Sequence, residues 1–211
     1  MTALNFAVGR HEAIVVADEL LSSPSGPGGT TKVLPLPHMH ALLACAGAKA
    51  VSLYAFAELV TGSRLDDTAA TWAVRLPALL SRFWQESELD RNTTAVLIGV
   101  VDGRLCGWMF TAPTFNASPL RAGAPYTMPP LHAISEAAQE AAQATPAQSE
   151  PESAAAADER PEPPLPPWQT VRRYLVDVMR EQAAEQRAPI GGKRTVWTIT
   201  PDCVHVTWLP M

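Results

Sequence analysis

The sequence predicts an α+β fold made of antiparallel strand pairs and a few amphipathic helices. Leu4 to Val8 and Ala13 to Ala17 are apolar runs separated by four mostly polar residues, which is a hairpin pattern. Residues 94–101 and 104–111 flank Asp102-Gly103, a dipeptide that strongly favours a tight hairpin turn. Helical periodicity occupies the stretch that directly precedes the second of these hairpins. The order along the chain is therefore four strands, two helices, two strands, a linker, a helix and two strands.

A second strand pair follows the first hairpin. Thr31 to Leu36 and Ala41 to Ala46 are apolar runs joined around Pro37-His38, and Gly47 ends the second run. Between the two pairs, Ser22 to Gly29 contains only serine, proline and glycine, so we expect a loop there.

Two helices are expected in the middle of the chain. The first covers Ala48 to Val60, with Gly62 as its stop, and Asp66 or Asp67 can cap the second. Pro77 lies within the second helix and predicts a kink or two short helices. The apolar stripe of the second helix contains Trp72, Leu76, Leu79, Leu80, Phe83 and Trp84.

A compositional change marks the last third of the chain. Residues 113–130 read as irregular, and residues 136–167 hold many alanines, prolines and glutamates but no aromatic residue. Such a segment buries too little apolar surface to offset its ordering entropy. We therefore expect residues 136–167 to be a disordered, low-complexity insertion, or a frayed helix, in a single domain that spans residues 1–211.

Order is expected to return at Trp168. Apolar residues at helical spacing predict a helix from Trp168 to about Arg187, and Gly191-Gly192 ends it. Arg194 to Thr200 and Cys203 to Trp208 predict a final hairpin across Pro201-Asp202.

Composition limits the function classes. The chain has 211 residues, 47% of them hydrophobic, and a formal net charge of −5 without a basic cluster, which argues against nucleic-acid binding. Cys45, Cys106 and Cys203 each lie in an apolar run, and three apparently buried thiols suit a reducing cytoplasm. No metal-ligand spacing, secretion signal or membrane span of about 20 residues is present, so we expect a cytoplasmic protein with no metal or other cofactor and no membrane partner.

Thr2 is the candidate residue with the most chemical consequence. If Met1 is removed, Thr2 carries a hydroxyl nucleophile and an α-amino group on one residue, and such an amine titrates near pH 8, roughly. The alternative is that Thr2 is only the small residue that commonly follows an initiator methionine.

Several residues resemble those of the proteasome β-subunit family of N-terminal nucleophile (Ntn) hydrolases, in particular its bacterial proteasome-like branch. Thr2 precedes Asp18 by sixteen positions, which is the family spacing between nucleophile and aspartate. Thr31-Lys32-Val33 resembles the strand that carries the family lysine, and Leu42 to Ala48 resembles the strand that leads into a glycine turn at Gly47. The resemblance implies a four-layer αββα sandwich with two antiparallel sheets between helix layers.

The resemblance also implies catalytic roles. The Thr2 hydroxyl would attack a peptide carbonyl while its own amine takes the proton, and the charge on Lys32 would lower the pKa of that amine. Asp18 would pair with Lys32, and the N–H of Gly47 would donate to the developing oxyanion, a contact typically worth about 3 kcal/mol. Two alternatives stay open: Asp18 as a turn residue that caps the following loop, and Lys32 as an edge-strand lysine that discourages strand addition.

The resemblance implies a threonine-dependent hydrolase of peptides or unfolded protein within a homo-oligomeric ring or stack, and it suggests an unfoldase as a further partner. Trp72, Phe83 and Trp84 would then lie partly in an interface between subunits. A catalytically inactive structural or assembly protein of the same fold, and an Ntn amidohydrolase for a small amide, are the alternatives.

Overall fold

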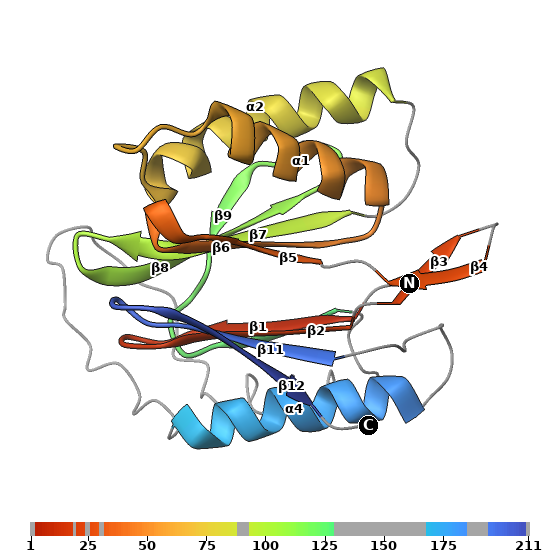
Figure 1. Cartoon of the computed structure of the whole chain (residues 1–211), viewed down its shortest axis with the longest axis vertical. Helices are drawn as coiled ribbons and strands as arrows, with labels where there is room; N and C mark the ends of the chain where they lie inside the picture. The colour runs from red at the N-terminus through yellow and green to blue at the C-terminus, as the bar shows by residue number, and fades with distance from the viewer. Residues whose placement is uncertain are drawn as a thin grey trace, which may run out of the picture.

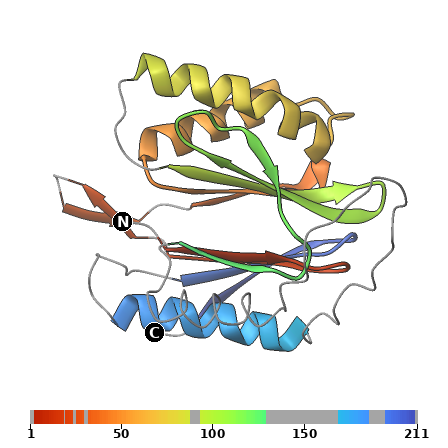
Figure 2. The ribbon, with the colours of Figure 1, turned by 180° about the vertical axis from the view of Figure 1, so that it is seen from behind.

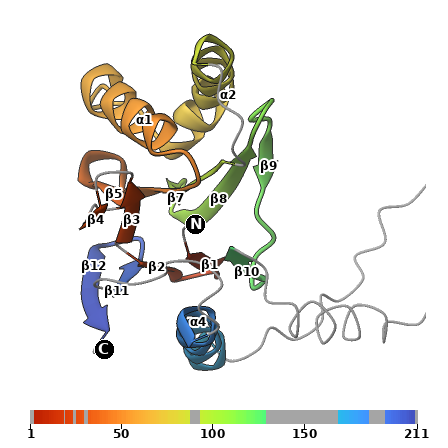
Figure 3. The same cartoon turned by 90° about the vertical axis from the view of Figure 1, so that its right-hand side faces the viewer.

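The structure is a computed structural model that describes residues 3–18, 20–23, 26–29, 32–87, 93–128, 168–184 and 194–209. Two five-stranded antiparallel sheets lie face to face between a layer of two helices and a layer of one helix (Figures 1 and 3). The predicted α+β, four-layer αββα arrangement is therefore confirmed. The expected insertion at residues 136–167 lies outside the described residues, and so does Gly191-Gly192.

One sheet, called here the β2 sheet, has the strand order β10-β1-β2-β11-β12. Its members are β1 (Leu4–Val8), β2 (Ala13–Asp18), β10 (Pro125–Met128), β11 (Arg194–Ile199) and β12 (Val204–Leu209). The predicted first and last hairpins are confirmed as β1–β2 and β11–β12, and the Gly9 N–H donates to the Glu12 carbonyl at 2.8 Å to close the first turn.

The other sheet, the β6 sheet, has the strand order β5-β6-β7-β8-β9. Its members are β5 (Val33–Leu36), β6 (Ala41–Ala46), β7 (Thr94–Val101), β8 (Arg104–Thr111) and β9 (Ala117–Pro119), and the 3₁₀ turn η1 (Pro37–Met39) joins β5 to β6. The β7–β8 hairpin has the predicted bounds, with Asp102 at φ 50° and Gly103 at φ 72° in its turn. Both residues have the positive φ that a tight type I′ turn requires.

Two segments expected to be loops contain strands. Residues 20–29 form a separate two-stranded sheet from β3 (Leu20–Ser23) and β4 (Gly26–Gly29), so the predicted Ser22 to Gly29 loop is wrong. Residues 113–130 were expected to be irregular but contain β9 and β10, which extend one edge of each sheet. Figure 2 shows the chain passing from β9 in the β6 sheet to β10 in the β2 sheet. For β9 and β10, pairing with an available sheet edge overrides the weak strand propensity of these short, proline-containing runs.

The helices α1 (Lys49–Gly62) and α2 (Ala69–Glu86) cover the β6 sheet, and α4 (Trp168–Ala184) covers the β2 sheet (Figure 1). α1 ends at Gly62 as predicted. α2 is one continuous helix that includes Pro77, so the alternative of two short helices is wrong, and the alternative of a kink stays a prediction. Proline removes a single hydrogen bond, whereas the apolar face of α2 keeps the helix on the sheet. None of the described helices is long and apolar enough to cross a membrane.

Three layers of apolar contacts hold the sandwich together. Between the sheets lie side chains such as Phe6, Val15, Leu42 and Ile98. Between the β6 sheet and its helices lie Leu43, Leu59, Trp72, Leu76 and Leu80, among others. Between the β2 sheet and α4 lie Ile14, Val16, Leu175 and Met179. Trp72 is only 2% exposed, so it is a core residue. Phe83 and Trp84 pack partly buried against the same core, and their part in a subunit contact stays a prediction.

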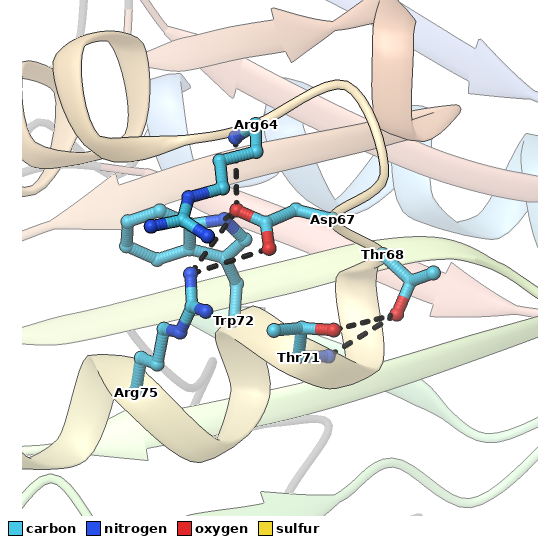
Figure 4. A network of polar contacts seen from close by, with 6 residues as sticks. All are labelled: Arg64, Asp67, Thr68, Thr71, Trp72 and Arg75. Atoms are coloured by element: carbon cyan, nitrogen blue, oxygen red, sulfur yellow. Dashed lines mark hydrogen bonds and ion pairs between the residues drawn. The ribbon is translucent and has the colours of Figure 1, made fainter.

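The start of α2 is held by a polar network that differs from the predicted cap (Figure 4). Thr68 is the N-cap, and its hydroxyl accepts a hydrogen bond from the Thr71 N–H at 3.2 Å. Asp67 instead accepts from the Arg64 N–H, the Trp72 indole N–H and the Arg75 guanidinium at 3.0 to 3.2 Å. The backbone N–H of Arg64, together with the charge of Arg75, lowers the pKa of Asp67. Asp67 therefore joins the α1–α2 connection to the buried indole.

The cysteines have three different environments. Cys45 is buried in β6, and burial raises the pKa of its thiol to about 12. Cys106 is partly buried, whereas Cys203 is exposed. The expectation that all three are buried is wrong for Cys203, because it lies at the turn into the outermost strand of its sheet.

We predict that Asp67→Ala destabilises the protein by about 1–3 kcal/mol at pH 7, because the substitution leaves the buried Trp72 indole N–H without its acceptor. Since the folded-state pKa of Asp67 lies below its unfolded value, this stabilisation is complete above about pH 4 and is lost as the pH falls through the folded pKa. Chemical denaturation should therefore show a smaller difference in the free energy of unfolding between Asp67→Ala and wild type at pH 3 than at pH 7. Asp66→Ala, at an exposed neighbour, is the control, and equal stability of the two variants at pH 7 would contradict the assignment.

Candidate functional site

Buried polar side chains gather at one end of the sandwich. This end holds the start of β1, the end of β2 and the start of β11, because Leu4 pairs with Ala17 and Arg194 pairs with Asp18. The buried polar residues there are Asn5, Asp18, Lys32, Thr93, Gln182 and Thr195. Buried polar groups cost free energy unless they are paired, so such a concentration marks a candidate site.

The centre of the site is an ion pair between Asp18 and Lys32. The Lys32 Nζ lies 2.6 Å from the Asp18 Oδ1, and the two residues are 4% and 0% exposed. Asp18 is the last residue of β2, whereas Lys32 directly precedes β5 in the other sheet. The pair therefore joins the two sheets. A buried lysine does not serve as a solvent-facing edge residue, and Asp18 accepts from Lys32 rather than acting only as a turn cap.

Asp18 also holds the start of β1. Its Oδ1 accepts a hydrogen bond from the Ala3 N–H at 2.9 Å, and its own N–H donates to the Ala3 carbonyl at 3.3 Å. Thr2 itself lies outside the described residues.

Gly47 follows β6, and its backbone is held on both sides. The Lys32 carbonyl accepts from the Cys45 N–H at 2.9 Å, and the Thr93 hydroxyl accepts from the Ala48 N–H at 2.9 Å. Gly47 is exposed and has a φ of 111°, a conformation that other residues rarely adopt. Gly47 therefore lies two residues after Cys45, whose N–H donates to the Lys32 carbonyl.

A second polar contact secures α4 at the same end. The Asn5 side-chain amide donates to the Gln182 Oε1 at 2.9 Å, and the Met128 N–H donates to the Asn5 Oδ1 at 3.3 Å. Asn5 therefore connects β1 to both α4 and β10.

The sequence reasoning missed Asn5, Thr93 and Gln182. Asn5 could have been singled out from the sequence, because it is the polar residue within the otherwise apolar run Leu4 to Val8. Nothing in the sequence singles out Thr93 or Gln182, since each meets its partner only in the folded chain.

The arrangement places a buried positive charge near the start of β1. The charge of Lys32 is balanced by Asp18 inside the protein, where electrostatic interactions are stronger than in water. In the part of the chain that the structure describes, no group of three or more His, Cys, Asp or Glu side chains could hold a metal ion.

Comparison with known proteins supports the fold directly. No family model matches the chain, and no curated protein matches its sequence. Many solved structures do match, among them an Anbu (Gly-1) mutant from Hyphomicrobium sp. strain MC1, with a TM-score of 0.64 and 13% sequence identity over 99% of this chain and 87% of that chain. The chain therefore shares its four-layer fold with that protein. At this identity the likeness establishes the fold, and the chemistry must be argued from the residues themselves.

We predict that Lys32→Met destabilises the protein by about 3–5 kcal/mol, because it leaves the Asp18 carboxylate buried without a counter-charge. The double variant Asp18→Leu, Lys32→Met should recover much of this loss, since it removes both charges together. Chemical denaturation measures both effects, with Lys49→Met at an exposed lysine as control. A Lys32→Met protein as stable as wild type, or a double variant no better than the single one, would be incompatible with a buried ion pair.

Proposed function

We propose that this protein is a proteasome-like Ntn hydrolase that cleaves peptide amide bonds with Thr2 as nucleophile after removal of Met1. The observation that carries the proposal is the buried Asp18–Lys32 pair, whose Asp18 binds the backbone N–H of the residue next to Thr2. The proteasome-like fold supports the same reaction class.

The proposed reaction begins with attack of the Thr2 hydroxyl on the peptide carbonyl. The Thr2 α-amino group accepts the hydroxyl proton, and the positive charge of Lys32 favours the neutral, basic form of that amine. The Gly47 N–H donates to the oxyanion that develops on the carbonyl oxygen. The amine then returns its proton to the leaving nitrogen, and an ester forms at Thr2. Water, deprotonated by the same amine, hydrolyses this ester and releases the second product.

The energetics of the pair favour a chemical role over a purely structural one. Moving two charges out of water costs several kcal/mol per ion, and an apolar pair at the same place is often as stable or more stable. A buried charge pair at the end of an otherwise apolar strand is therefore poorly explained by stability alone. A buried charge pair can shift the pKa of a nearby amine, which apolar side chains cannot do.

We predict that the purified protein lacks Met1 and that an electrophile directed at N-terminal threonine labels it. Thr2→Ala should abolish labelling, and Lys32→Ala should slow it by about 100-fold or more, because the amine then loses the positive charge that lowers its pKa and keeps it unprotonated. Intact-mass measurement tests both steps, and Lys49→Ala serves as the control for loss of a lysine. Quantitative retention of Met1, or equal labelling of all variants, would remove Thr2 from the mechanism.

We further propose that copies of the chain assemble into a ring or stack through the outer face of α1 and α2. Leu53 and Val60 on α1 are 52% and 63% exposed, and Val74 on α2 is 79% exposed. Leu53 and Val60 are seven residues apart, so they lie on one side of the helix. These three residues replace the expected Trp72 as candidates for the subunit contact.

We predict that light scattering gives a mass above that of the monomer for the wild-type protein. The double variant Leu53→Glu, Val60→Glu should shift to smaller species, because charges in an apolar contact oppose association. Leu65→Glu, in the exposed α1–α2 connection, should not change the mass. A wild-type protein that is monomeric at every concentration would refute the assembly.

A further inference from the structure

A thiol and an imidazole form a pair at the opposite end of the β2 sheet from the Asp18–Lys32 site. Cys203 lies in the turn between β11 and β12, and His205 lies in β12. The register places this turn beside the start of β2, because Ile199 pairs with Ala13, whereas Arg194 pairs with Asp18 at the other end. In Figure 1 this turn is the blue one at the left end of the β2 sheet, next to the red β1–β2 turn.

The geometry of the pair is that of a nucleophile beside a base. The Cys203 Sγ lies 3.0 Å from the His205 Nε2 and 3.2 Å from the Thr200 hydroxyl. The Cys203 N–H also donates to the Thr200 hydroxyl at 3.2 Å, which holds the turn in place. Residues two apart in an extended chain point to the same side, and this spacing brings the thiol and the ring together.

The pair is open to solvent. Cys203 and His205 are both exposed, and β12 is the outermost strand of its sheet. The other two thiols provide a contrast inside the same molecule. Cys45 is buried and burial raises its pKa to about 12, and Cys106 is partly buried within β8. Reactivity of a thiol requires both access and a means of losing its proton, and Cys203 combines access with a neighbouring base.

We propose that Cys203 is a thiol–disulfide exchange site that takes up low-molecular-weight disulfides, with His205 as its base. The Nε2 of neutral His205 accepts the thiol proton, and the Cys203 thiolate attacks one sulfur of the disulfide. The new S–S bond forms as the old one breaks, and the second sulfur leaves as a thiolate. This thiolate takes the proton from the imidazolium, so His205 returns to its neutral form. The products are a mixed disulfide at Cys203 and one free small thiol.

Incubation of the full-length protein with excess oxidised glutathione tests the proposal, with the mixed disulfide at each cysteine followed over time by peptide mass spectrometry. At pH 7 we expect Cys203 to be modified first, and His205→Gln to slow its modification by about tenfold or more. His11→Gln, at an exposed histidine in the β1–β2 turn, should leave the rate unchanged. At pH 10 the wild-type and His205→Gln rates should converge, because hydroxide then removes the thiol proton without help from an imidazole.

Three results would overturn the proposal. The first is equal modification of wild type and His205→Gln at pH 7. The second is a slow-down in His205→Gln that persists at pH 10, which would show that His205 shapes the turn rather than taking the proton. The third is modification of Cys106 as fast as that of Cys203. None of these outcomes depends on Thr2, so the test is independent of the proposed hydrolase activity.

Discussion

The contact between Asp18 and Lys32 is the interaction on which the arrangement of the candidate site depends. It joins the last residue of β2 to the residue before β5, and so it couples the two sheets at one end of the sandwich. The same carboxylate holds the Ala3 N–H, and the Lys32 carbonyl holds the Cys45 N–H just before Gly47. Four strand ends, those of β1, β2, β5 and β6, are thereby fixed around one buried charge pair. A shift of either sheet along the other would separate two charges in a medium of low polarity, which is energetically costly.

The surroundings of the pair complement this constraint. Asn5 ties β1 to Gln182 on α4, and the Thr93 hydroxyl holds the Ala48 N–H behind Gly47. These contacts restrain backbone at the same end without adding charge. A rigid frame of this kind suits a site in which an amine, a hydroxyl and a backbone donor must act on one carbonyl group. The Cys203–His205 pair lies at the other end of the β2 sheet, and the reaction proposed for it is a different one.

The sequence predicted those elements whose pattern is local. The Asp102-Gly103 hairpin has the expected bounds because turn chemistry and alternation agree there. β9 and β10 were missed because their pairing depends on sheet edges that exist only in the folded protein, and β3 and β4 were missed because their serine- and glycine-rich runs carry little strand signal. A division of α2 at Pro77 and a cap at Asp67 were wrong because packing outweighed local rules, and Cys203 was misjudged because an apolar run can be an exposed edge strand. Asp18 and Lys32 were found through resemblance, whereas Thr93 and Gln182 have no sequence spacing that reveals their partners.

A crystal structure of the purified protein without Met1 tests the central claim most directly. The account predicts that Lys32 remains buried against Asp18 and that the Thr2 hydroxyl and α-amino group lie within hydrogen-bond reach of each other and beside the Lys32 Nζ, on the side of the Gly47 N–H. A Thr2 side chain that points away from Lys32 and Gly47, or a Lys32 that extends into solvent, would contradict it.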